Sequence, residues 1–219
     1  MPRLTRVASQ ARTRAQLIET ARQMFLRDGY FATSLDKVAD AAGYSKGAVY
    51  SNFASKDELC LAVLDALLAE RAGQIALAVA GRKRFAGKLA AFEQWATQAL
   101  GDEGWITLEI EFASQARANP ELRTAFAERA GAIRSAIALV LESGAQDAGG
   151  QLPLPADELA TTVLSVGLGL AVQRAFDPAV SVRTLTNTIR VIVGLPIRAP
   201  AARRRRRAVR PVPAGPAQP

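Results

Sequence analysis

The stretch "TSLDKVADAAGYSKGAVYSNFASKDEL", residues 33–59, carries the start and stop signals of several helices within one short span. Ser45 fits a helix N-cap, and Ser55 with Glu58 three residues later fits a capping box. Gly43 fits the left-handed residue that ends many helices. The pattern predicts two short helices separated by a tight turn and then a longer helix that runs to about Ala80.

A longer helix is expected ahead of this stretch, over about residues 12–27. Leu17, Ala21 and Phe25 fall on one face of that helix, and Gly29 is placed to end it. Strand patterns are nearly absent from the whole chain, because no alternating run of Val, Ile and Thr is bounded by turns. The sequence therefore predicts an all-α protein.

Two short helices at a tight turn, resting on a longer helix, make a helix-turn-helix. In that motif the N-terminal residues of the second helix reach base edges in the major groove of DNA. Lys46 suits guanine or phosphate acceptors, while Gly47 and Ala48 allow close approach. We expect Thr33 to begin the first short helix, with Asp36 completing a capping box. The candidate DNA-contacting residues are Thr33, Ser34, Ser45, Lys46, Gly47, Ala48, Tyr50, Ser51, Asn52 and Lys56.

Basic residues precede the motif and form a predicted N-terminal arm, assigned to residues 1–11 and continued by the first helix. Such an arm suits the DNA backbone or the minor groove. Its arginines are Arg3, Arg6, Arg12 and Arg14. The alternative is a helix-turn-helix used only for packing, which leaves the arm and the lysine at the groove-facing position without a role.

The string "RDGYFATSLDKVADAAGYSKGAVYSNFASKDEL" resembles the DNA-binding domain of the tetracycline-repressor (TetR) family of bacterial regulators, over roughly residues 12–60. The resemblance implies an all-helical homodimer with a variable C-terminal ligand domain, whose last two helices form a four-helix dimer interface. It also implies that Lys46, Tyr50 and Lys56 occupy the family's usual DNA-contacting positions. Tyr44 and the pair Ser51-Asn52 depart from the common pattern of the family.

Charge is concentrated at the two ends of the chain, which has a formal net charge of +8. Residues 1–60 have nine basic and six acidic side chains, residues 61–195 have twelve and fourteen, and residues 196–219 have seven arginines and no acid. Basic ends suggest a polyanionic partner such as DNA. The tail at 196–219 is expected to be disordered, and its Arg203–Arg207 run either adds non-specific DNA affinity or only keeps the protein soluble.

Several classes of protein are disfavoured by what the sequence lacks. It has no histidine, which removes histidine-based catalytic triads and histidine metal ligands, and it has no glycine-rich phosphate loop. We therefore expect no catalytic residue, no metal and no cofactor. No apolar run reaches the roughly 18 residues of a membrane span, so we expect no membrane partner and a cytoplasmic protein.

The second half of the chain reads as a helical domain for effector binding and dimerisation, residues 61–195. Helices are expected at about 85–100, 105–118, 120–141, 157–176 and 181–193. Small residues such as Gly167 and Gly169 permit close helix approach, so the last two helices suit a two-fold four-helix interface. Intramolecular packing of the same faces is an alternative, and both can hold at once.

A pocket is expected in this second half, although aromatic residues at helical spacing also serve as plain core. Glu109 falls between two apolar stripes of its helix, while Glu111 points to the solvent side. Glu109 either pairs with an arginine such as Arg129 or Arg134, or anchors a ligand. The candidate ligand-binding residues are Trp95, Trp105, Leu108, Glu109, Phe112 and Phe126. Such a lining favours a largely apolar effector.

We therefore expect a dimeric DNA-binding regulator, a repressor that a small effector releases from its operator. The alternative of the same class is an activator or a regulator that needs no ligand. An enzyme is the rival of another class. The lone Cys60 is either a redox sensor or a small buried apolar residue, and the second is the more common role.

Overall fold

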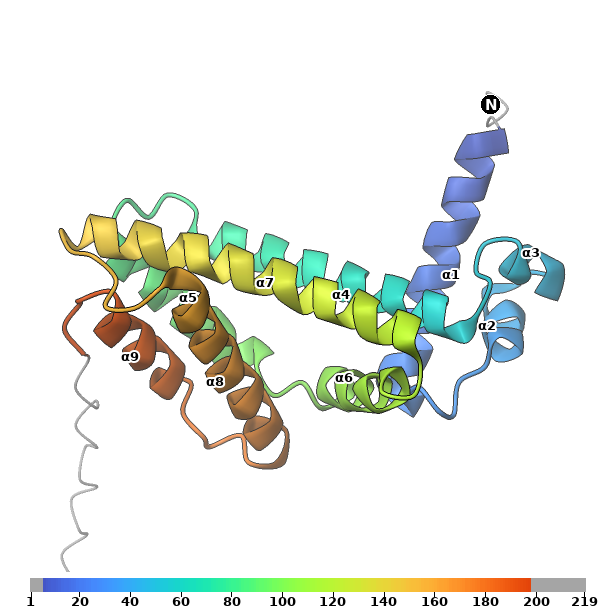
Figure 1. Cartoon of the computed structure of the whole chain (residues 1–219). Coiled ribbons are helices and arrows are strands. Elements are labelled where there is room, and N and C mark those ends of the chain that lie inside the picture. The colour runs from blue at the N-terminus through green and yellow to red at the C-terminus, as the bar shows by residue number, and fades with distance from the viewer. Residues whose placement is uncertain (1–5, 198–219) are drawn as a thin grey trace, which may run out of the picture.

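The computed structural model describes residues 6–197, and every regular element in that part of the chain is an α-helix, as predicted. The helices are α1 (Arg6–Asp28), α2 (Leu35–Ala42), α3 (Lys46–Tyr50), α4 (Lys56–Val79), α5 (Phe85–Ala99), α6 (Glu103–Ala116), α7 (Pro120–Asp147), α8 (Ala156–Phe176) and α9 (Arg183–Ile192). The molecule is elongated, with α1–α3 at one end, α9 near the other, and α4 running between them (Figure 1). Arg3 and the arginine-rich run Arg203–Arg207 lie outside the described residues.

Two helices are longer than the sequence predicts. The first already begins at Arg6, so the second half of the expected arm is helical. The second, α7, continues to Asp147, past Gly144 and beyond the predicted end near residue 141. A Cβ at Gly144 would lie 2.7 Å from Cζ of Phe85. Gly144 therefore lies within α7 and allows the ring of Phe85 to pack closely against this helix. It does not end the helix.

The core of the DNA-binding end is shared with a helix from the second half of the chain. Leu17, Ala21 and Phe25 of α1 are fully buried, as their spacing predicts. They belong to a cluster that also contains Leu108 and Phe112 of α6, both fully buried. The N-terminal core therefore crosses the expected domain boundary at residue 60.

A second core cluster joins α5, α7, α8 and α9. Of the described helices, α8 is long and apolar enough to cross a membrane by length and composition, which the sequence analysis did not expect. Core helices of other proteins pass the same test, and α8 packs against α7 and α9 here. A stripe along it stays uncovered in the single chain, with Leu168 46% and Phe176 86% exposed.

Arg174 of α8 ties three segments of the second half together. Its buried guanidinium donates hydrogen bonds to the carbonyls of Thr97 and Leu100, at the end of α5, each at 2.8 Å. It also donates to the carbonyls of Pro178 and Val180 in the turn before α9. A buried charge requires such partners, so Arg174 fixes how α5, α8 and α9 meet.

Candidate nucleic-acid interface

The short helix α3 presents its first turn to solvent at the end of the molecule. Ser45 is its N-cap, because its Oγ accepts a hydrogen bond from the amide of Ala48 at 3.2 Å. Val49 and Phe53 are fully buried and hold the helix against the core. Ser45, Lys46 and Gly47 are exposed, and a Cβ at Gly47 would meet only Ser45 Oγ within 4 Å. The exposed edge is therefore small, polar and open to a partner, as the sequence predicts.

A shallow concavity of about 400 Å³ lies beside α3, between the starts of α2 and α4. Ser34 caps α2 and Ser55 caps α4, so two helix N-termini border the concavity. Tyr50, which is 55% exposed, forms another part of its lining. Helix N-termini and hydroxyl groups attract anions, so this surface suits a phosphate group. The complete lining is Ser34, Leu35, Asp36, Tyr50, Ala54, Ser55 and Lys56.

Three of the expected DNA contacts donate hydrogen bonds to carbonyls of the protein itself. Thr33 is buried, and its hydroxyl donates to the carbonyl of Gly29 at 2.9 Å, so Ser34 and not Thr33 caps the helix. Ser51 Oγ and Asn52 Nδ2 both donate to the carbonyl of Ala48, at 2.9 and 2.8 Å. These side chains satisfy backbone carbonyls near helix ends. Sequence spacing alone does not distinguish that role from contact with a base.

Lys56 contributes to the concavity and also braces the chain segment that follows α1. Its Nζ donates to the carbonyls of Tyr30 and Thr33, each at 3.1 Å, and lies 4.0 Å from the centroid of the Tyr30 ring. The Tyr30 hydroxyl donates to the carboxylate of Asp57. An ammonium has three donors, so Lys56 keeps one for an external acceptor.

Arg14 was assigned to the basic arm, and the structure places it elsewhere. Its Nη1 donates to the carbonyl of Asn52 at 2.6 Å, and its guanidinium lies 4.1 Å from the centroid of the Phe53 ring. It therefore fastens α1 to the end of α3. Arg12 is exposed on the same helix and remains available to a backbone phosphate.

The first half of α6 packs closely against the end of α1. A Cβ on Gly104 would lie 2.4 Å from the carbonyl oxygen of Leu26. About two turns further along the same side of α6, Glu111 accepts a hydrogen bond from the amide of Tyr30 at 2.5 Å. Sequence periodicity placed Glu111 on the solvent side, and that prediction is wrong because Gly29 and Tyr30, which directly follow α1, lie against its carboxylate. The contact joins the two halves of the chain.

Comparison with known proteins assigns both halves. Residues 17–63 match the family model of the bacterial regulatory proteins of the TetR family. Residues 88–193 match the model of the C-terminal domain of BetI-type transcriptional repressors. The chain belongs to the TetR family. It is therefore a transcriptional regulator with a helix-turn-helix, and its relatives are named as regulators and not as enzymes.

Several curated relatives match this TetR-family chain over short stretches of about 50 residues. The transcriptional activator FasR of Mycolicibacterium smegmatis is 49% identical over 51 residues, which cover 23% of each chain. The repressor AcnR of Corynebacterium efficiens is 26% identical over 136 residues, 61% of this chain and 66% of AcnR. For FasR and two further curated regulators, TtgR and ArpR of Pseudomonas putida, this chain matches only about a quarter of the relative's length.

A solved structure of a transcriptional regulator from Rhodococcus sp. RHA1 shares the fold. Its TM-score is 0.61 at 22% identity, over 83% of this chain and 94% of that chain.

The C-terminal half of this TetR-family chain does not gather the six candidate ligand residues around one cavity. Leu108 and Phe112 face the N-terminal core, where Trp105 and Phe126 pack against the same cluster. Trp95 lies apart on α5, where its indole donates to Gln74 at 3.0 Å. Sequence periodicity identified the leucine and aromatic candidates as apolar positions of their helices. It could not distinguish residues that fill a core from residues that line a pocket.

Glu109 is engaged in an ion pair in this TetR-family structure. Arg129 Nη2 lies 3.4 Å from its Oε1, and the two side chains are 10% and 18% exposed. The same nitrogen donates to the carbonyl of Leu64 on α4 at 2.8 Å. This pair therefore joins α4, α6 and α7, and it matches the structural alternative for Glu109. Of the atoms described, Nη1 of Arg129 is buried without a hydrogen-bond partner.

The burial of the Glu109 carboxyl should be detectable in the pH dependence of stability. Burial raises the pKa of its carboxyl above the ordinary glutamate value, although Arg129 acts in the opposite direction. A raised native pKa means that the folded state holds this proton more tightly than the unfolded state. The stabilising effect of the protonated form is complete at low pH and is lost as pH rises through the native pKa.

We therefore expect the wild type to gain stability over the variant Glu109→Gln as pH falls from neutral to the ordinary glutamate pKa of about 4.3. Urea unfolding at several pH values measures that difference. Glu128→Gln, at an exposed position of α7, should give a profile parallel to the wild type. Parallel profiles for Glu109→Gln as well would contradict the assignment.

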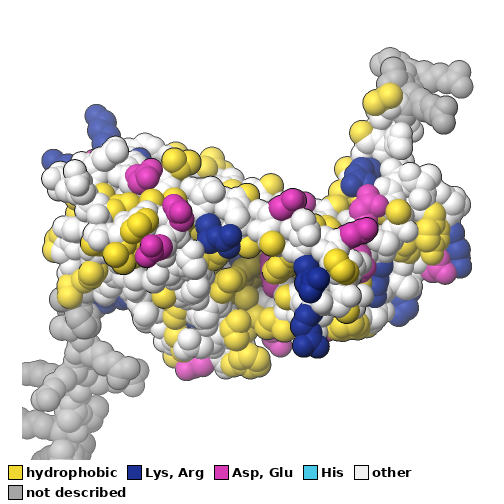
Figure 2. Space-filling view, viewed as in Figure 1, with side chains coloured by type: hydrophobic (Ala, Val, Ile, Leu, Met, Phe, Trp, Pro, Cys, Tyr) yellow, Lys and Arg dark blue, Asp and Glu magenta, His cyan; other side chains and the backbone are white. Residues whose placement is uncertain are grey.

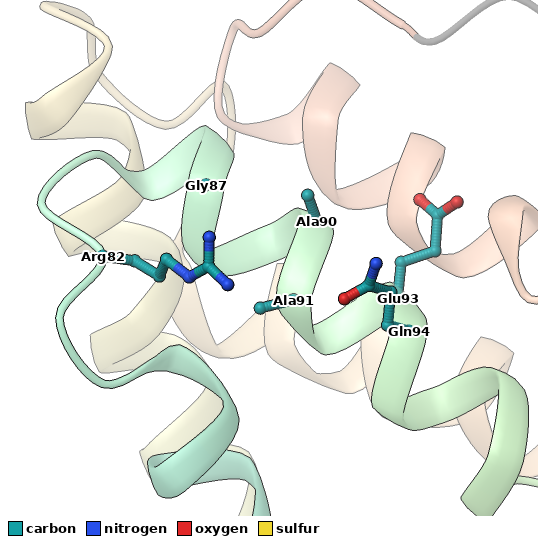
Figure 3. Close-up of a pocket in the computed structure, with 6 residues that line it drawn as sticks. All are labelled: Arg82, Gly87, Ala90, Ala91, Glu93 and Gln94. Carbon is teal, nitrogen blue, oxygen red and sulfur yellow. The ribbon is translucent and has the colours of Figure 1, made fainter.

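A second concavity, of about 340 Å³, lies along α5 in the C-terminal half of this TetR-family chain. Its floor consists of small residues of α5, with Arg82 at one side and Glu93 at the other (Figure 3). The carboxylate of Glu93 accepts a hydrogen bond from the hydroxyl of Thr186 on α9 at 2.9 Å. None of the six candidate ligand residues lines this concavity.

Cys60 is fully buried in the N-terminal core, and burial raises the pKa of its thiol. A protonated thiol that solvent does not reach is a poor redox sensor. The structure supports the packing role of Cys60.

Proposed function

We propose that this regulator is a cytoplasmic homodimeric repressor that binds a near-palindromic operator and is released by a small, largely apolar effector. The exposed first turn of α3 carries the proposal, because Ser45, Lys46 and Gly47 form an open polar edge next to the concavity that two helix N-termini border. In this proposal Lys46 contacts a base edge or phosphate, and Ser34, Tyr50 and Lys56 contact phosphates.

Dimerisation through α8 and α9 is supported by apolar side chains that the single chain leaves uncovered. Leu168 and Phe176 of α8 and Val191 of α9 are exposed. A Cβ at Gly169 would meet no atom within 4 Å, so another helix could approach this face closely. A two-fold dimer would then place the two α3 helices about one turn of DNA apart, or a multiple of it.

Release by an effector requires a path from the sensor half to α3. The contact between α6 and α1 supplies such a path, since a shift of α6 would move Gly104 and Glu111 against Leu26 and Tyr30. An effector shifts this equilibrium only if it binds the two conformers with different affinities. The buried positions of Leu108 and Phe112 and the match to the activator FasR favour a second candidate, a regulator that activates or needs no ligand.

Footprinting of the full chain on the DNA that flanks its own gene, with and without apolar compounds, tests the proposal. We expect two protected half-sites about 10 base pairs apart, or a multiple of that. Lys46→Ala should weaken binding by about tenfold, whereas Lys83→Ala, in the loop at the far end of the molecule, should not. Absence of protection at low salt would refute operator binding, and binding that no compound alters would leave only the ligand-independent candidate.

A further inference from the structure

Asp36 on α2 holds the lysine at the tip of α3. Nζ of Lys46 lies 2.6 Å from Oδ2 of Asp36, and their side chains are 63% and 46% exposed. This carboxylate raises the pKa of Lys46, so the ammonium stays charged in the pair. On the face shown in Figure 2, basic and acidic side chains lie beside one another at the end formed by α2 and α3. The groove-facing lysine is therefore partly neutralised in the free protein.

The fold does not need this pair. Exposed ion pairs contribute little to stability because solvent screens them and both side chains lose freedom. The cap of α2 is supplied by Ser34, whose Oγ accepts from the amide of Lys37 at 3.2 Å. Asp36 is thus free of the capping role that the sequence analysis gave it.

The position of Asp36 is unexpected for a surface that attracts phosphate. It is the acidic member of the concavity lining, whose other polar side chains are Ser34, Tyr50, Ser55 and Lys56. A carboxylate at that place repels phosphates of any sequence. It also holds the ammonium of Lys46 in one position. Without this partner, the flexible lysine side chain could contact any phosphate within its reach.

We propose that Asp36 determines specificity by holding Lys46 for a base-edge acceptor and away from phosphates, so that random DNA binds weakly. An ammonium has three donors, so Lys46 can keep its bond to Asp36 and still donate to a guanine acceptor once α3 is seated in the groove. Random DNA does not place a matching base at that position, so phosphates remain the acceptors within reach, and toward them the charge of Lys46 is already offset. The inference rests on the proposed function, because it requires that α3 enter the groove.

The variant Asp36→Asn of the full chain tests this assignment on a random duplex and on the duplex protected in the footprint. We expect its affinity for the random duplex to rise roughly fivefold to tenfold at about 0.1 M salt. The logarithmic salt dependence should steepen by about one, the value for one added phosphate contact. Affinity for the protected duplex should rise less than about twofold, because Lys46 is already placed for its base acceptor there.

Two further variants make the test specific. Asp40→Asn removes the same charge from an exposed position one turn further along α2, and it should change neither duplex affinity by more than about twofold. In the background Lys46→Gln, the change at Asp36 should have no such effect on random DNA. Thermal unfolding of each variant establishes that it is folded.

The outcomes separate this inference from the proposed function. If the wild type and Asp36→Asn both fail to bind any duplex at low salt, the proposed function fails. If the wild type binds but Asp36→Asn behaves as Asp40→Asn, or strengthens both duplexes equally, the assignment of Asp36 is overturned. An effect that persists without Lys46 also overturns it, because Asp36 would then act on phosphates without its lysine.

Discussion

Replacing Arg174 by methionine is expected to lower the free energy of unfolding by about 3 to 4 kcal/mol. Methionine retains most of the apolar stem but removes hydrogen bonds to four carbonyls in two segments, the end of α5 and the turn before α9. Those carbonyls would be left without their buried donor, and each unsatisfied group costs about 1 to 3 kcal/mol, although such terms do not simply add. The melting temperature should fall by roughly 10 °C.

Urea unfolding with the matched variant Arg123→Met measures the effect. Arg123 is an exposed arginine on α7, so its loss should change stability by less than about 0.5 kcal/mol. Equal stability of the two variants would mean that the end of α5 and the turn before α9 are held together without Arg174.

Replacing Gly104 by alanine should destabilise the protein by about 1 to 2 kcal/mol and weaken operator binding. Alanine favours a helix over glycine by about 1 kcal/mol, so helix propensity alone predicts the opposite sign. The new Cβ, however, would lie 2.4 Å from the carbonyl oxygen of Leu26 and 3.2 Å from its carbon. Backbone atoms cannot rotate away as a side chain does, so α6 and α1 must separate. That movement carries α2 and α3 with it.

The control for this prediction is Gly73→Ala on α4, where a Cβ would meet no atom within 4 Å. Here helix propensity decides the sign, and stability should rise by about 0.5 to 1 kcal/mol. Thermal unfolding and operator titration of both variants test the contrast. A gain in stability for Gly104→Ala would show that the contact between α6 and α1 is loose.

Local signals in the sequence were sufficient for most of the helices. Ser45, Ser55 and Gly43 act as the caps that their positions predict, because a cap depends on neighbours in the chain. The end of α7 was predicted too early, near residue 141, because a glycine inside a helix, as Gly144 is, and a glycine that ends one differ only in what packs against them. In this chain that neighbour is the ring of Phe85.

The site was harder to predict where partners come from distant parts of the chain. Lys46 was identified as a candidate contact, but its pairing with Asp36 depends on the angle between α2 and α3, which spacing does not contain. Arg14 was predicted to belong to a basic arm, because its contact with the carbonyl of Asn52 joins residues that are distant in the sequence. Glu111 was predicted to face solvent because its partner, the amide of Tyr30, lies far away in the sequence.

The burial of Leu108 and Phe112 in the N-terminal core has a consequence for chimeric regulators. A helix-turn-helix cut at residue 60 and transplanted onto another sensor would lose two of the large side chains that fill its own interior. The recipient would have to supply residues of matching shape on its sixth helix, or the graft would be left with a void. Exchange of target specificity in this protein is therefore better attempted by altering the few surface residues of α3 than by moving the whole module.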